Sequence, residues 1–208
     1  MKFLLGLLAA ALILFVLLQF GILAVSSALH GQNRFDAEIA WLENSRPFMP
    51  LPARLDSRLE RRYLERVRRA LVDDKLDRAV HAYRTARLHA KNSGRPLDRA
   101  LMGLGIECYT RAADRLEAHG RLSLAADWDD SLFVLAIRAP EPHHRYAALA
   151  AFIEGLDLRV RDGKPCAALA RVEWARKGLG GEVPGLQASV EEDLAVQCRQ
   201  SRRAPRRR

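Results

Sequence analysis

Residues 3–29 form an almost unbroken apolar segment, preceded by one charged residue, Lys2. A helix rises 1.5 Å per residue, so this segment would extend about 40 Å, enough to cross a membrane's hydrocarbon core of ~30 Å with some tilt. The sequence therefore predicts a membrane-spanning helix over residues 1–30 that contacts the bilayer through residues 3–29. The remainder of the chain is then tethered to a membrane or exported.

The same segment could instead be a cleaved signal peptide. The apolar core of such peptides has about 7–15 residues, and residues 3–18 alone exceed that length. Small residues at Ala24-Val25-Ser26 and Ser26-Ser27-Ala28 would nevertheless suit a signal peptidase. We expect an uncleaved anchor, with cleavage as the alternative.

The basic residues that flank the span predict its orientation. Lys2 lies on the amino side, and the twenty residues after the span contain only Arg34 and Arg46. This slight bias favours an amino terminus in the cytoplasm. The body would then lie on the periplasmic or extracellular side of the inner (cell) membrane.

The net charge of +9 is concentrated at the carboxyl end, because the last ten residues contain six arginines. The rest of the chain carries only +3, with acids and bases interspersed. Residues 201–208 therefore predict a disordered tail able to bind anionic lipids, phosphates or an acidic partner. Nucleic acid is not expected, because aromatic residues are absent from the tail. The arginines proposed for anionic contacts are Arg202, Arg203, Arg206, Arg207 and Arg208.

The chain between the span and the tail is rich in Ala, Leu and Arg, which favours helix. Residues 31–54 predict a short juxtamembrane helix at about 34–44 and a stiff proline-rich connector. Residues 55–200 predict a helical domain whose first helix is capped by Asp56 or Ser57. We expect helices at about 55–72, 76–91, 97–119, 122–138, 142–161, 165–177 and 185–198.

Three of the expected turns are alike. Each has a helix-ending residue followed by a base, at Asp74-Lys75, Gly120-Arg121 and Gly163-Lys164. An alanine follows each turn at the same offset, and a large residue precedes each by eleven positions. The alanines are Ala79, Ala125 and Ala168, and the large residues are Tyr63, Tyr109 and Phe152.

This pattern resembles the tetratricopeptide repeat family over residues 59–177, with residues 185–198 as a solvating cap. The turns are 46 and 43 residues apart, whereas the family repeats about every 34, so the copies would be elongated. The resemblance implies an all-α array of antiparallel helix hairpins whose first helices line a partner groove near Tyr63, Tyr109 and Phe152. The alternatives are an irregular helical bundle and a purely structural role for the three aromatics.

Two of the three cysteines are placed to form a disulfide. Cys166 begins one expected helix and Cys198 ends the next, and the midpoint between them falls in the connecting turn. In an antiparallel hairpin these positions face each other, so an oxidising compartment would join them. The alternative is two independent thiols. Cys108, inside a helix, is expected to be a buried thiol.

No catalytic, cofactor-binding or metal-binding set emerges from the sequence. His143 and His144 adjoin Glu141, but neighbouring helical residues point about 100° apart, so a solvated helix start is expected. Asp127, Asp129 and Asp130 are expected to form an acidic solvent-exposed face.

The sequence thus predicts a membrane-anchored helical-repeat scaffold that binds proteins of a cell-envelope assembly. It is not expected to be an enzyme or to hold a cofactor. One alternative is an exported helical enzyme that uses Glu141 or Asp129 on envelope material. The other is an anionic-surface binder that acts through the arginine tail.

Overall fold

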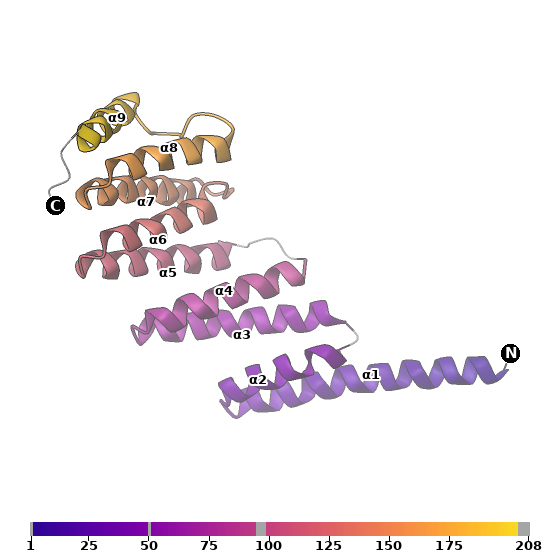
Figure 1. Ribbon diagram of the computed structural model, residues 1–208. Helices are drawn as coiled ribbons and strands as arrows, with labels where there is room; N and C mark the ends of the chain where they lie inside the picture. The colour runs from indigo at the N-terminus through magenta and orange to yellow at the C-terminus, as the bar shows by residue number, and fades with distance from the viewer. Residues whose placement is uncertain (1, 50, 95–98, 204–208) are drawn as a thin grey trace. The chain divides into compact units, whose positions relative to one another are not determined.

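The computed structural model describes residues 2–49, 51–94 and 99–203, and these are almost entirely helical, with no strand among them (Figure 1). The predicted all-α class is therefore confirmed. The helices are α1 (Lys2–Gly31), α2 (Phe35–Ser45), the 3-10 helix η1 (Arg46–Phe48), α3 (Pro52–Val72), α4 (Leu76–Asn92), α5 (Arg99–Ala118), α6 (Leu122–Ala136), α7 (Pro142–Arg161), α8 (Pro165–Leu179) and α9 (Ala188–Arg203).

The chain divides into two compact units, Met1–Leu101 and Met102–Arg208. In unit 1, α1 packs on α2, α2 on α3, and α3 most extensively on α4. In unit 2, α6 packs most extensively on α7, and α8 packs on both α7 and α9. Helices that are consecutive in the sequence are therefore neighbours in space within each unit.

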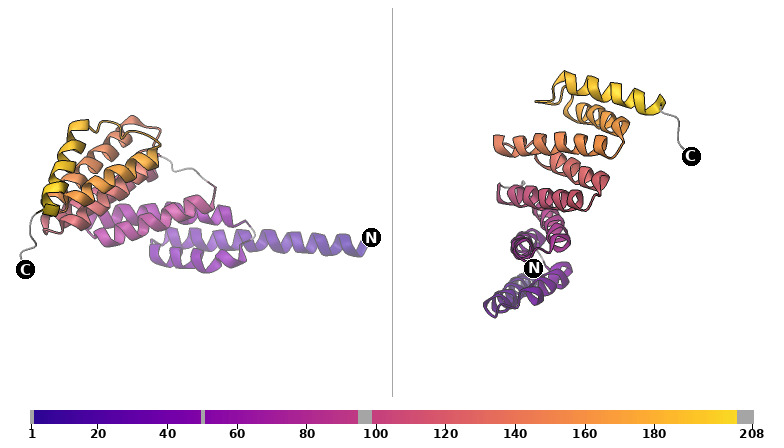
Figure 2. Two further views of the ribbon diagram at one scale, coloured as in Figure 1. Left: turned by 45° about the horizontal axis from the view of Figure 1, so that its top comes forward. Right: turned by 90° about the vertical axis from the view of Figure 1, so that its left-hand side faces the viewer.

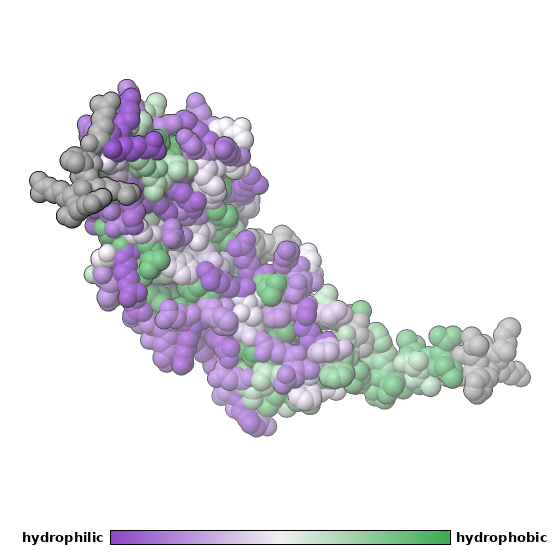
Figure 3. Space-filling model, viewed as in Figure 1, coloured by the Kyte–Doolittle hydropathy of each residue, from purple (hydrophilic) through white to green (hydrophobic). Residues whose placement is uncertain are grey.

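Helix α1 is long and apolar enough to cross a membrane, as predicted. Its apolar side chains are exposed over its first part; Leu14 is 68% exposed and Phe20 69%. In Figures 2 and 3 this part extends beyond α2 with a largely hydrophobic surface. From Gln19 onward one side of α1 is covered, because Gln19, Ile22 and Ser26 are buried. The helix thus combines a bare apolar stretch with a carboxyl end that belongs to the folded body.

Among the described residues, four turns that end in a basic residue share one backbone conformation, one more than the sequence pattern indicated, and the end of α8 at Gly180 adopts it too, with Gly181 in place of the base. The residue before the base has a positive φ in each: Asn33, Asp74, Gly120 and Gly163. The base then donates its backbone N–H five residues back, as in Arg34 to Leu29 (3.0 Å) and Lys75 to Ala70 (2.8 Å). Arg121 and Lys164 do the same. The additional turn joins α1 to α2.

The turn at Asn33 places α1 and α2 in register with the later helices. Ile22 lies eleven positions before Asn33, as Tyr63 lies before Asp74, and both are buried. The base of this turn is Arg34, and the residue four positions after it is Glu38. The other three copies have alanine at this position. The end of the apolar helix therefore follows the same pattern as the helices of the body.

Two predicted helix ends are wrong. Helix α3 begins at Pro52, at its first turn, rather than at an Asp56 or Ser57 cap. Proline suits that position because its missing N–H has no intrahelical acceptor there. Helix α9 continues to Arg203 instead of ending near Cys198, since Arg and Gln favour helix. Arg202 and Arg203 of the predicted tail are thus helical, and residues 204–208 lie outside the described residues.

The other predictions for this region hold in outline. The juxtamembrane helix is α2, and the connector contains η1. Asp56 is buried in α3, where it accepts from Arg46 (Nε–Oδ1 3.1 Å) and contacts His89 of α4 (Nδ1–Oδ1 2.7 Å). These contacts join η1, α3 and α4. The expected start of the next helix at Leu97 lies outside the described residues.

Candidate functional site

The three aromatics near the expected groove are all buried, at 5% exposure for Tyr63 and Tyr109 and 0% for Phe152. Tyr63 stacks on His89 with ring centroids 5.7 Å apart, and Phe152 contacts Phe133 at 4.6 Å. Tyr109 lies 5.2 Å from Trp128. These side chains support the packing of their helices. A partner could only reach the exposed residues beside them.

Helix α7 has such an exposed apolar face. Tyr146 is 71% exposed and Ile153 is 43% exposed, and Ala150 lies between them at helical spacing. The opposite side of the same helix buries Ala148, Phe152 and other small or apolar residues. Helix α7 therefore carries apolar residues on the side that packs and also, at Tyr146, Ala150 and Ile153, on the side that faces solvent.

Carboxylates adjoin this apolar face. Partial burial raises the pKa of Glu154, and the nearby charges of Glu117, Asp114 and Asp157 raise it further. Arg161 of α7 opposes them through an ion pair with Glu117 (2.6 Å). The carboxylates of Asp114, Glu117, Glu154 and Asp157 thus lie close together on α5 and α7.

A second polar centre lies inside unit 2, the Asp130 cluster of Asp130, Arg159, Arg171 and Asp127. Asp130 accepts from Arg159 of α7 (2.6 Å) and Arg171 of α8 (2.7 Å), so one carboxylate of α6 connects three helices. Arg159 also donates to Asp127 (3.0 Å). The expectation of an acidic solvent face is wrong for Asp130, which is 4% exposed, because the arginines come from helices distant in the sequence.

Asp129 is also buried, at 3% exposure, against the same expectation. Its Cβ lies 3.1 Å from the Cβ that a side chain at Gly155 would have, so Gly155 allows α7 to approach α6 closely. Burial, followed by the charges of Glu154, Asp130 and Asp114, raises the pKa of Asp129 to about 7. A general acid has to reach its substrate, and this carboxyl group is enclosed by protein.

Unit 1 has its own buried charge, the Glu38 cluster of Glu38, Ser26, Arg58 and Arg62. Glu38 of α2 is fully buried against the end of α1. Its carboxylate accepts hydrogen bonds from Ser26 of α1 (2.7 Å) and from Arg62 of α3 (2.9 Å). Arg58 lies 3.6 Å from the same carboxylate. Nearby, the Trp41 indole donates to the Ile22 carbonyl (3.1 Å). These bonds hold α1, α2 and α3 together.

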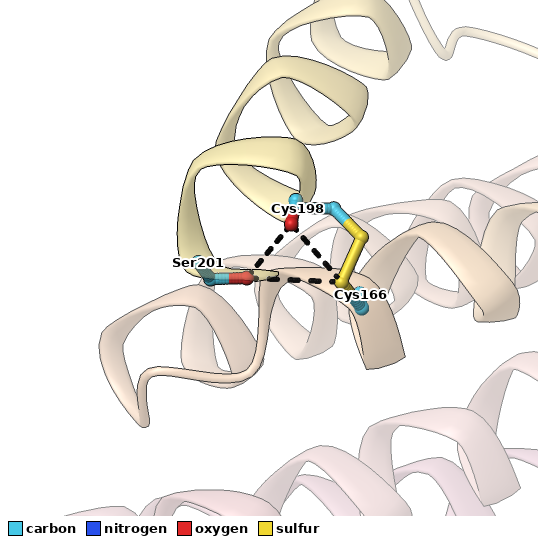
Figure 4. The surroundings of a disulfide bond; sticks show 3 residues. All are labelled: Cys166, Cys198 and Ser201. Atoms are coloured by element: carbon cyan, nitrogen blue, oxygen red, sulfur yellow. Dashed lines mark hydrogen bonds between the residues drawn. A yellow bond between two sulfur atoms is a disulfide. The ribbon is translucent and has the colours of Figure 1, made fainter. Parts of the chain in front are cut away.

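The predicted cysteine pair lies at disulfide distance. Cys166 of α8 and Cys198 of α9 are bonded, with their Cα atoms 4.7 Å apart (Figure 4). Arg176 and Glu191 add an ion pair between the same helices. Cys108 is fully buried, as expected, and burial raises its thiol pKa to about 12.

The remaining sequence candidates do not form a site. His144 is buried beside Glu141 (3.3 Å), which differs from the expected solvated helix start, whereas His143 is exposed. Within the described residues, no group of three His, Cys, Asp or Glu side chains could hold a metal ion. Of the tail arginines, Arg202 is exposed, and Arg206, Arg207 and Arg208 lie outside the described residues.

The chain matches no protein-family model, and neither the curated proteins nor the solved structures include a match to it.

Proposed function

We propose that this protein is a membrane-anchored helical-repeat scaffold that binds a partner protein of a cell-envelope assembly. The observation that carries the proposal is the solvent-exposed face of α7, where Tyr146 and Ile153 adjoin the carboxylates Asp114, Glu154 and Asp157. Such a face fits a partner segment with apolar and basic side chains. The proposed contacts lie in unit 2, beyond the anchor.

The proposed architecture is a series of antiparallel helix hairpins similar to tetratricopeptide repeats, with elongated copies. Its support is the common conformation of the turns at Asn33, Asp74, Gly120 and Gly163, and the shared backbone bonds that follow each. In this arrangement the first copy consists of the carboxyl end of α1 together with the whole of α2. In each copy the first helix lines the binding face, which places α7 there.

The same arrangement supports the proposal that the anchor is retained. The small residues that would suit a signal peptidase lie inside α1, and Ser26 is fully buried against Glu38. Cleavage there would remove a helix that α2 packs on. We place the amino terminus in the cytoplasm and the body outside, where an oxidising compartment would maintain the Cys166–Cys198 bond.

The binding face can be tested by site-specific photo-crosslinking in intact cells. A photoreactive residue at Tyr146 or Ile153 should capture the same partner, and one at Gln197, an exposed position on α9, should not. Charge reversal of Glu154 and Asp157 to lysine should weaken that crosslink. Absence of any crosslink at both α7 positions would contradict the proposal.

The placement of the body needs a separate measurement. Alkylation of intact cells with a membrane-impermeant reagent, before and after reduction, reports the thiols of Cys166 and Cys198. We expect labelling only after reduction. Labelling of both thiols without reduction would contradict the disulfide, and no labelling in either condition would place the body in the cytoplasm.

A further inference from the structure

A basic pocket lies beside the anchor in unit 1, and the proposed scaffold function does not require it. It encloses about 580 Å³ between α1 and α3. We call it the arginine pocket. Its lining residues are Leu23, Arg54, Ser57, Arg58, Arg61, Arg62 and Glu65.

The arginines of this pocket fall into two pairs. Arg58 and Arg62 are held by Glu38, and they are only 24% and 12% exposed. Arg54 and Arg61 are exposed, and neither has an ion-pair partner among the described residues. Four guanidinium groups therefore face two carboxylates, Glu38 and Glu65. The excess positive charge is carried by the exposed pair.

The pocket lies at the level where α1 would leave the hydrocarbon core. From Lys2 to Leu23 the helix rises about 32 Å, close to the ~30 Å thickness of that core. Arg58 donates to Ser27 (2.9 Å), four residues after Leu23, which brings α3 against α1 at this level. Trp41, 37% exposed and bonded to Ile22, lies at the same level of the helix. Tryptophan is typical of the membrane interface.

We infer that the arginine pocket binds the phosphodiester headgroup of an anionic phospholipid in the leaflet that surrounds the end of α1. Arg54 and Arg61 donate to the phosphate oxygens, since guanidinium groups match phosphate geometry and carry charge. Leu23 contacts the first carbons of the acyl chains. The inference rests on the proposed function in one respect, that α1 is embedded in a bilayer.

The test uses the full-length protein in an uncharged detergent, with bound lipid measured by native mass spectrometry. Wild type should retain phosphatidylglycerol over phosphatidylcholine by about tenfold, a difference of ~1.4 kcal/mol. Arg54→Gln/Arg61→Gln should lower retention of phosphatidylglycerol to that of phosphatidylcholine. The matched control is Arg68→Gln/Arg87→Gln, which removes the same charge from two exposed arginines outside the pocket. It should bind lipid as wild type does.

Equal retention of phosphatidylglycerol by wild type and Arg54→Gln/Arg61→Gln would overturn the inference. So would its displacement by inorganic phosphate, which would make free phosphate the ligand. Should the double variant unfold, Arg61→Gln alone replaces it and should lose part of the preference. Failure of the anchor is a distinct result, because alkaline extraction would then release every variant from membranes.

Discussion

Each of the two units buries a carboxylate between arginines, but the two carboxylates join different sets of helices. Glu38 of unit 1 joins the end of α1 to α2 and α3, and its arginines lie beside a basic pocket. Asp130 of unit 2 joins α6, α7 and α8 and lies next to a second buried carboxyl group, Asp129. The first centre connects the long apolar helix to the rest of unit 1, and the second connects three helices of unit 2.

The difference shows how burial changes the role of a charge. Arg159, 7% exposed, depends most on protein carboxylates for compensation, because the other arginines of the two clusters are more exposed: Arg62 12%, Arg58 24% and Arg171 33%. Removing one partner of a buried ion pair leaves the other charge uncompensated in a low dielectric. Among these arginines, Arg159 should therefore be the most sensitive to the loss of its carboxylate.

The largest effect is expected for Asp130→Asn. It leaves Arg159 and Arg171 without their shared carboxylate, which should lower the free energy of unfolding of unit 2 by about 3–5 kcal/mol. Denaturant unfolding of the full-length protein in detergent, followed by circular dichroism, measures the loss. Asp127→Asn is the control, because the Asp127 side chain is 67% exposed and its pair should contribute ~1 kcal/mol or less. Equal losses of unfolding free energy in the two variants would refute the conclusion that Asp130 is the main carboxylate partner of these arginines.

The disulfide provides the next largest effect and is confined to unit 2, since all three cysteines lie there. It closes a loop of 32 residues, and the loop-entropy relation gives a stabilisation of about 3–4 kcal/mol. Cys166→Ser/Cys198→Ser, or added reductant, should lower the unfolding midpoint accordingly. Reductant should leave the double variant unchanged. If reductant also lowered the unfolding midpoint of the double variant, the effect of reductant could not be assigned to the Cys166–Cys198 bond.

Much of this arrangement is accessible to sequence reasoning, because it depends on local pattern. Turn residues and alanine offsets predict the turns at Asp74, Gly120 and Gly163, and spacing alone predicts the cysteine pair. The fourth turn was predictable too. Asn33 and Arg34 continue the pattern 41 residues before Asp74, but the apolar run that precedes them conceals it.

The polar centres could not be predicted in the same way. Asp129 and Asp130 follow Trp128 and Asp127 in a strongly polar stretch, and an exposed acidic face is the ordinary outcome of such a sequence. The burial of Asp130 depends on arginines 29 and 41 residues further along the chain. Long-range pairing of this kind leaves no periodic signal in the sequence, and Gly155, which permits the close approach, has no obvious pattern around it.

The pKa of Asp129 predicts that the stability of unit 2 depends on pH. Its pKa is raised from an ordinary 3.8 to about 7 in the folded state, so between these values the folded state binds the proton and the unfolded state does not. Stability must then fall as pH rises from about 4 to about 7, by about 3–4 kcal/mol, since each pKa unit corresponds to ~1.4 kcal/mol and titration is incomplete at both ends of this range. Thermal unfolding measured across this range should show the slope in wild type. Asp129→Asn should flatten it, and an unchanged slope would exclude Asp129 as its source.

The smallest effect is expected at Glu38, and it tests whether α1 and α2 form a repeat copy. Glu38→Ala introduces the alanine of the other copies but leaves Ser26 unbonded in a buried position, which should cost about 2 kcal/mol, and it also removes the carboxylate that pairs with Arg58 and Arg62. Adding Ser26→Val reproduces the apolar pair Val67 and Ala79, so the double variant should recover about 1 kcal/mol, because replacing both polar partners removes the unsatisfied group. Denaturant unfolding of the single and double variants gives the coupling free energy between the two sites. Recovery of stability in the double variant would mean that the end of α1 accepts the valine and alanine found at the matching positions of the α3–α4 copy. A double variant no more stable than Glu38→Ala would mean that the loss comes from Arg58 and Arg62 without their carboxylate, and not from the unbonded Ser26.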